Sequence, residues 1–150
     1  MIQRIIERAD VKHSVNADKI LKEIKNYDIV SFDIFDTLLK RNVKEPTDVF
    51  SYMEKKYQID GFCEKRIEAE KTARKKKNGL EVTLKDIYTE FGTDYSDEEL
   101  ETESELLIAN DEVYPIFRKC IESKTVIIVS DMYLPENFIK EILKKEQIIG

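Results

Sequence analysis

Two carboxylates at the end of an apolar segment are the residues of this sequence best suited to chemistry. The segment IVSFDIF, residues 29–35, is rich in β-branched and aromatic side chains and carries Asp33, and Asp36 follows it directly. Carboxylates are common groups for acid–base work, but they are rarely buried without a partner. Taken alone, this pair would indicate only a turn in which Asp36 caps a helix.

A second apolar segment of the chain also ends in polar residues. The run TVIIV, residues 125–129, is followed at once by Ser130 and Asp131. Such a nearly continuous apolar run is typical of a strand that is buried on both faces of a parallel sheet. Ligands of doubly wound α/β folds bind at the carboxyl ends of the strands, so we expect both polar clusters to meet at one edge and form a site. For Asp131 an ordinary turn position stays an equal alternative.

Helical patterns surround these two strands and, together with them, predict an α/β fold. Between residues 43 and 113 the sequence contains amphipathic patterns and helix-capping signals, which indicates a helical insert. We predict helices over residues 2–9, 17–24 (capped by Asn16 or Ser14) and 62–77, and helices that begin at Pro46, at Thr83 with Asp86, at the capping-box pattern Ser96–Glu99, at Pro115 and at Pro135.

The charge and composition of the chain argue against several classes of protein. Charged residues make up 37% of the 150 residues and the net charge is −6, which argues against general affinity for nucleic acids or anionic membranes. No apolar run approaches the roughly 20 residues that span a bilayer. Cys63 and Cys120 stand far apart without a CxxC motif, which is typical of a reduced cytosolic protein. We therefore expect a cytoplasmic protein, and we interpret its basic run at residues 71–77 as a solvated helix face.

The strand-end sequences VSFDIFDTLL, residues 30–39, and VIIVSD, residues 126–131, resemble the first two motifs of the haloacid dehalogenase-like hydrolase superfamily. In that family a Rossmann-like parallel sheet forms the core, and in many members a helical cap lies between these motifs. The resemblance implies a core of residues 1–42 and 114–150, incomplete because the later strands are missing. It also implies an all-helical cap of residues 43–113.

The resemblance implies roles for individual residues. Asp33 is expected to attack phosphorus and form a covalent aspartyl intermediate, with Mg²⁺ bound by its carboxylate and by the backbone carbonyl of Phe35. Ser130 is expected to hydrogen-bond a phosphate oxygen, and Thr37 to brace the turn after the strand. The candidate phosphate-binding residues are Thr37, Ser130, Asp131 and Arg41.

Two departures from the family pattern affect the expected activity. Phosphatases of the family usually carry a second aspartate, which serves as general acid and base, at the position of Phe35. Asp36 comes one residue later, and the sequence leaves open whether it replaces that acid or lines the turn. The later lysine and acidic-pair motifs do not occur before Gly150. We therefore expect either the first part of a longer protein or an incomplete domain, with weak or no activity as given; whether further domains follow Gly150 stays open.

The leading interpretation is a Mg²⁺-dependent phosphatase that acts on a small phosphorylated metabolite, with Asp33 and Asp36 as its candidate catalytic residues. Two alternatives stay open. Because Phe35 replaces an acid, the chain resembles members that cleave carbon–halogen or carbon–phosphorus bonds. The signature SFDIFDTLL followed by SDMYLP is also similar to domains found beside bacterial polysaccharide-biosynthesis glycosyltransferases, which implies a non-catalytic assembly or regulatory module.

Overall fold

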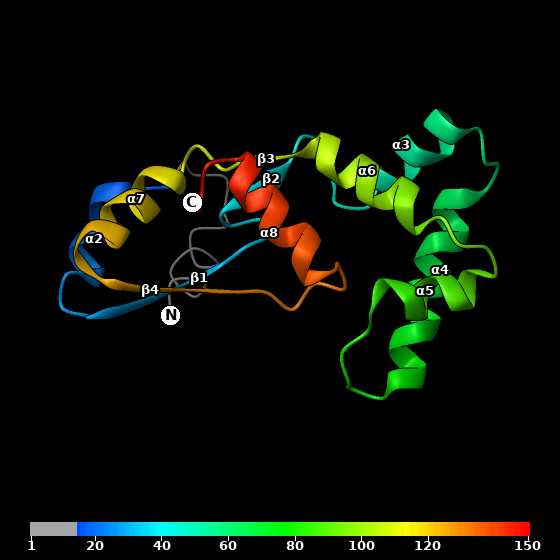
Figure 1. Ribbon diagram of the computed structural model, residues 1–150, viewed down its shortest axis with the longest axis horizontal. Helices are drawn as coiled ribbons and strands as arrows, with labels where there is room; N and C mark the ends of the chain where they lie inside the picture. Colours follow the sequence, from blue (N-terminus) through cyan, green and yellow to red (C-terminus); the bar gives the residue numbers. More distant parts are fainter. Residues whose placement is uncertain (1–14) are drawn as a thin grey trace. The chain divides into compact units, whose positions relative to one another are not determined.

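The structure is a computed structural model that describes residues 15–150. The predicted helix over residues 2–9 and the alternative cap Ser14 lie outside the described residues. The described chain is a mixed α/β protein, as predicted (Figure 1). Within residues 15–150 no helix is long and apolar enough to cross a membrane.

The chain divides into two compact units, each made from two stretches of sequence. The first unit runs up to Lys40 and resumes over Ile108–Ser130, whereas the second comprises Arg41–Leu107 and Asp131–Gly150. The predicted division into a core of residues 1–42 and 114–150 and a cap of residues 43–113 stays a prediction.

The first unit contains a two-stranded parallel sheet. Its strands are β1 (Ile29–Asp33) and β4 (Thr125–Val129), which pair in register along their whole length. β-Branched and aromatic residues favour strands, and both segments are rich in them. The order of the two strands along the chain and their parallel direction agree with the sequence-based expectation.

Two helices of the first unit pack against each other, and one of them contacts the sheet. α2 (Ala17–Ile24) begins after Asn16, whose side chain accepts a hydrogen bond from the backbone N–H of Lys19 at 3.0 Å, so the predicted cap is confirmed. α7 (Tyr114–Ser123) contacts both α2 and β4 (Figure 1). The fully buried ring of Phe32 meets the ring of Phe117 edge-on, with 5.3 Å between centroids.

The prediction that β4 is buried on both faces is wrong for the described structure. The side chains of Ile127 and Val129 are each 47% exposed, and Ile29 on β1 is 59% exposed. Successive side chains of a strand point to opposite faces. Phe32 lies on the face that contacts α7, and the residues on the other face are the exposed ones. An apolar run therefore predicted the strand but not how many of its faces are covered.

A second two-stranded sheet joins β2 (Leu39–Arg41) to β3 (Leu107–Ala109), and the boundary between the units falls within both strands. The backbone N–H of Asn42 donates to the carbonyl of Leu106, and the N–H of Asn110 donates to the carbonyl of Leu38, both at 2.8 Å. One of these hydrogen bonds lies at each end of the strand pair, and residues that follow β2 bond to residues that precede β3. This is the pattern of antiparallel strands.

The second unit is mostly helical, as predicted, although β3 lies within residues 43–113, which were expected to be all-helical. Its helices are α3 (Asp48–Tyr57), α4 (Phe62–Lys77), α5 (Leu84–Phe91), α6 (Ser96–Leu106) and α8 (Glu136–Lys145). The predicted bounds of α4 are confirmed, and α3 begins two residues after Pro46. The predicted capping box at α5 is also confirmed, because Thr83 accepts from the N–H of Asp86 and the Asp86 carboxylate accepts from the N–H of Thr83.

The capping box predicted at the start of α6 is wrong. Ser96 is the first helical residue, and its N–H donates to the carboxylate of Asp94 at 3.0 Å. Glu99, the expected partner in the box, is fully buried. Its carboxylate accepts two hydrogen bonds from Arg66, at 2.7 and 2.8 Å, and one from the hydroxyl of Tyr88 at 2.6 Å.

The buried pair of Arg66 and Glu99 links four helices of the second unit. Arg66 lies on α4, Glu99 on α6 and Tyr88 on α5, and the guanidinium of Arg66 also stacks on the ring of Phe50 from α3 at 4.5 Å. Burial and the charge of Glu99 raise the pKa of the Tyr88 hydroxyl well above its ordinary value, so this group stays a donor. Breaking a buried ion pair is costly, because one charge then remains without compensation.

We expect Glu99→Gln to lower the free energy of unfolding by about 3 kcal/mol, because it leaves the buried guanidinium of Arg66 without its full counter-charge. Urea unfolding followed by far-ultraviolet circular dichroism measures this change. The matched control is Glu105→Gln, which removes the charge of a half-exposed partner of Lys56 and should cost less than about 1 kcal/mol. Equal losses in the two variants would contradict the prediction.

Candidate active site at the carboxyl ends of two parallel strands

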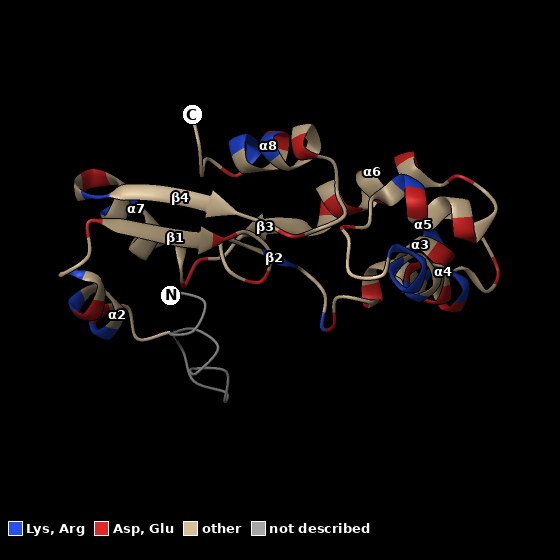
Figure 2. Cartoon of the chain, turned by 90° about the horizontal axis from the view of Figure 1, so that it is seen from below, with Lys and Arg blue, Asp and Glu red and all other residues tan. Residues whose placement is uncertain are grey.

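The candidate site lies where β1 and β4 end. Asp33, the last residue of β1, is paired with Val129, the last residue of β4, and Ser130 follows Val129 directly. Neighbouring strands lie about 4.8 Å apart, so the backbones of these residues are adjacent. The predicted meeting of the two strand ends at one edge is therefore confirmed. Figure 2 shows this edge, with the acidic end of β1 beside the end of β4.

The turn after β1 has an unusual backbone conformation at Asp36. This residue has a φ of 56°, which lies in the left-handed region, and its side chain is exposed. Its neighbours Phe35 and Thr37 are buried, with relative exposures of 7% and 5%. A hydrogen bond of 2.8 Å from the N–H of Leu39 to the carbonyl of Ile34 closes the turn. The left-handed conformation of Asp36 thus leaves its side chain exposed while the side chains of Phe35 and Thr37 are buried.

Thr37 connects the turn to the carboxylate of Asp33. Its hydroxyl donates to Oδ2 of Asp33 at 3.5 Å, which is long for a hydrogen bond of this type. The backbone carbonyl of Thr37 accepts a hydrogen bond from Nδ2 of Asn110 at 2.9 Å. The expectation that Thr37 braces the turn agrees with these contacts.

Asn110 is a residue of this site that the sequence reasoning missed. It lies 73 positions after Thr37, just beyond β3, yet its side chain reaches the turn that follows Asp33. The local pattern AND, residues 109–111, indicates only a turn before a helix. No periodicity in the sequence signals so distant a hydrogen bond.

Arg41 and Asp131 belong to the second unit, and the structure does not place them relative to Asp33. The guanidinium of Arg41 makes a bidentate contact with Glu103, at 2.9 Å from both Nε and Nη2, and both side chains are buried. Burial raises the pKa of the Glu103 carboxyl above its ordinary value, against the opposing effect of Arg41. The contact seen for Arg41 is therefore with a protein carboxylate, unlike the predicted contact with a substrate anion. Asp131 is exposed.

The residues around Asp33 supply few ligands for a metal ion. Among residues 15–150, no group of three or more His, Cys, Asp and Glu side chains is arranged to hold one. The predicted donors are the Asp33 carboxylate and the Phe35 carbonyl. Mg²⁺ commonly takes one or two carboxylates and completes its shell with water and substrate phosphate. This donor set fits an ion that is shared with a bound phosphate and does not fit a dedicated protein cage.

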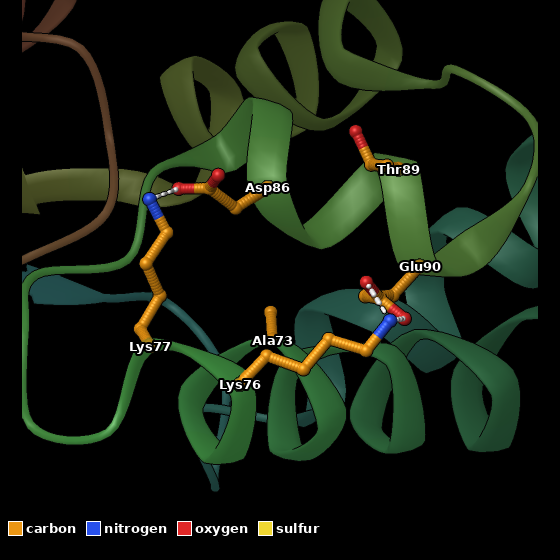
Figure 3. Close-up of a pocket in the computed structure, with 6 residues that line it drawn as sticks. All are labelled: Ala73, Lys76, Lys77, Asp86, Thr89 and Glu90. Atoms are coloured by element: carbon orange, nitrogen blue, oxygen red, sulfur yellow. Dashed lines mark hydrogen bonds and ion pairs between the residues drawn. The ribbon is translucent and has the colours of Figure 1, made fainter.

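A pocket in the second unit lies between α4 and α5, away from these residues in the sequence (Figure 3). Lys76 contacts Glu90 at 2.7 Å and Lys77 contacts Asp86 at 3.0 Å, so both lysines have acidic partners. The lysine and threonine contacts of the Asp86 carboxylate lower its pKa to about 2, with the hydrogen bonds from Thr83 as the largest cause. These pairs agree with the interpretation of the basic run as a solvated helix face.

Comparison with known proteins does not assign the chain to a family. A scan against protein-family models gave no match, and a search of curated proteins gave none either. A function for this chain is therefore inferred from its own residues and their geometry.

We expect Asp36→Gly to raise the free energy of unfolding by about 0.5–1 kcal/mol, because glycine adopts the left-handed conformation without a steric penalty. Chemical unfolding measures the change. Gln58→Gly is the matched control, since Gln58 also has a φ of 56° but ends α3 in the other unit. We expect the control to gain at least as much, because aspartate tolerates this region better than glutamine. A loss of stability in Asp36→Gly alone would contradict the prediction and reveal a contact of the carboxylate.

Proposed function

We propose that this chain carries the nucleophile of a hydrolase of the haloacid dehalogenase-like class, with a Rossmann-like core and a helical cap, acting on a small phosphate ester. The observation that supports the proposal most directly is the pairing of Asp33 with Val129. It brings a carboxylate and the hydroxyl-bearing Ser130 to one edge of a parallel sheet. In α/β folds this edge is where ligands bind.

In the proposed reaction the carboxylate of Asp33 attacks phosphorus. A bond forms between a carboxylate oxygen and phosphorus, the ester bond breaks, and the alcohol leaves with a proton taken from an acid or from water. Water then hydrolyses the aspartyl phosphate and regenerates the carboxylate. Because aspartate is a weak nucleophile, its orientation decides the rate. The hydrogen bond from Thr37 to Oδ2 supports this proposal, since it restricts that orientation.

Ser130 is proposed to bind the phosphate. Its exposed side chain follows β4 directly, next to the strand that ends in Asp33. A hydroxyl at this position can donate a hydrogen bond to a phosphate oxygen, which is a charge-assisted contact. Asp33 and the Phe35 carbonyl would hold Mg²⁺, which when bound neutralises charge on the transferred group.

The residues that could protonate the leaving group differ from the usual pattern of the proposed family. Phe35, at the position of the usual acid, is buried, and Asp36 is exposed in a left-handed conformation. Two versions of the chemistry follow. In one, Asp36 supplies the proton; in the other, it only lines the turn, and the enzyme uses leaving groups that need no protonation. The buried Phe35 is also compatible with cleavage of carbon–halogen or carbon–phosphorus bonds.

We expect Asp33→Asn to reduce the turnover of p-nitrophenyl phosphate and other phosphate esters by about a thousandfold or more, because it removes the nucleophile. The assay uses the full chain as it occurs naturally, and mass spectrometry after acid quenching should find a phosphoryl group on the peptide that contains Asp33. Asp28→Asn is the matched control, since Asp28 is an exposed acid just before the same strand. Turnover that survives in Asp33→Asn would overturn the proposed function. Absence of turnover in the unmodified protein would favour the non-catalytic module.

The activity of Asp36→Gly separates the two versions of the leaving-group step. If Asp36 supplies the proton, turnover of alkyl phosphates should fall more than tenfold, whereas that of aryl phosphates, with better leaving groups, should change little. If Asp36 only lines the turn, both substrates should be turned over as in the unmodified protein. Gln58→Gly again controls for the change in backbone freedom.

We expect Mg²⁺ alone to bind with a dissociation constant of about 1 mM or weaker, because one carboxylate and a carbonyl make a poor site for a hard cation. Isothermal titration calorimetry measures this affinity. Addition of beryllium fluoride, which mimics a phosphoryl group, should tighten it in the unmodified protein and not in Asp33→Asn. Micromolar binding of the metal alone would contradict this prediction.

A further inference from the structure

The backbone N–H, the backbone carbonyl and both polar side-chain atoms of Asn110 each take part in a hydrogen bond. Its backbone N–H donates to the carbonyl of Leu38 at 2.8 Å, and its Nδ2 donates to the carbonyl of Thr37 at 2.9 Å. Its Oδ1 accepts from the N–H of Glu112 at 3.2 Å, and its carbonyl accepts from the N–H of Tyr114 at 2.8 Å. The residue therefore connects the start of α7 to two successive carbonyls of the turn after β1. All of these residues belong to the first unit.

The turn that Asn110 contacts is closed by the hydrogen bond from the N–H of Leu39 to the carbonyl of Ile34. It contains a non-glycine residue in the left-handed region, Asp36. The link from Thr37 to Asp33 is a long hydrogen bond of 3.5 Å, whose strength depends on where the Thr37 backbone lies. Because this distance is already at the upper limit for a hydrogen bond, movement of that backbone away from Asp33 would break the link. The side-chain bond from Asn110 fixes the carbonyl of the same residue.

We propose that Asn110 is a positioning residue for Asp33, acting through Thr37. By holding the Thr37 carbonyl, its amide keeps the Thr37 hydroxyl within reach of Oδ2 of Asp33 and so orients the carboxylate. The inference deepens the proposed function and rests on it, since orientation matters only if Asp33 attacks a substrate. Misplacement of a reacting group by about 1 Å can cost a hundredfold in rate.

The chemistry of the contact explains why an asparagine serves here. The partner is a carbonyl, so the side chain must donate, and Oδ1 of the same side chain must accept from Glu112. Only a neutral amide of this length supplies both at once. Aspartate has the same shape but offers a second acceptor in place of the donor. Asn110→Asp therefore removes the contact to Thr37 while it keeps the volume of the side chain.

The test measures kcat and KM for p-nitrophenyl phosphate in the full chain. We expect Asn110→Asp and Asn110→Ala to lower kcat by about 10- to 100-fold while KM changes less than about twofold. Asp94→Ala is the matched control: it removes the side chain that accepts from the N–H of Ser96, so it perturbs a turn of the other unit. Its kcat should stay within about twofold of that of the unmodified protein.

A double variant tests whether Asn110 acts through Thr37. Thr37→Val removes the hydroxyl that contacts Asp33, so the combination of Asn110→Ala with Thr37→Val should lower kcat no further than the more damaging single change. Multiplied effects on kcat would overturn the proposed route through Thr37. A normal kcat in Asn110→Asp, or a loss confined to KM, would overturn the inference while the proposed function stands.

Hydrogen exchange supplies a measurement that does not depend on activity. The N–H of Leu39, bonded to Ile34 across the turn, should exchange at least about tenfold faster in Asn110→Asp than in the unmodified protein. Unchanged exchange would overturn the inference whether or not the protein is active. If the unmodified protein shows no turnover, the proposed function fails, and the exchange result alone decides whether Asn110 holds the turn.

Discussion

The register between β1 and β4 is the constraint on which the candidate site depends. These strands come from stretches of the chain that are separated by the whole helical insert, and only their pairing brings Asp33 opposite Val129. A slip of one residue would turn every side chain of a strand to the other face of the sheet. The apolar contact of Phe32 with Phe117 resists such a slip, because it fixes which face of β1 meets α7. Apolar burial on one face therefore sets the position of the polar residues at the strand ends.

The second unit is organised by buried charges. Arg66 and Glu99 are fully buried and bonded in a bidentate pair, and Arg41 and Glu103 form a second buried pair. Hydrophobic residues of similar volume would often be as stabilising as such pairs. Ion pairs, however, accept only partners of the right charge and geometry. The two pairs join α4 to α6 and β2 to α6.

The parts of this structure that could be predicted from the sequence are those set by local interactions. Strands β1 and β4, the bounds of α4 and the capping box at Thr83 depend on neighbours within a few residues, whereas β2 and β3 were not predicted. The capping box at Ser96 failed because Glu99, although correctly spaced, is bonded to Arg66, which lies 33 positions away. Asn110 was missed for the same reason, since its partner is 73 positions away. Exposure of the second face of β4 depends on what covers the sheet, which a strand's own residues do not encode.

The turn after Asp33 is shaped both by local backbone contacts and by the distant hydrogen bond from Asn110. Its left-handed residue, Asp36, lets Phe35 and Thr37 point inward on either side of it. Phe35 offers no acid at the position two residues after Asp33, while inward burial of Thr37 brings a hydroxyl to the carboxylate of Asp33. The same turn thus holds no acid two residues after Asp33 but places an exposed one, Asp36, three residues after it. In the proposed reaction the contact from Thr37 orients the nucleophile, whichever group protonates the leaving group.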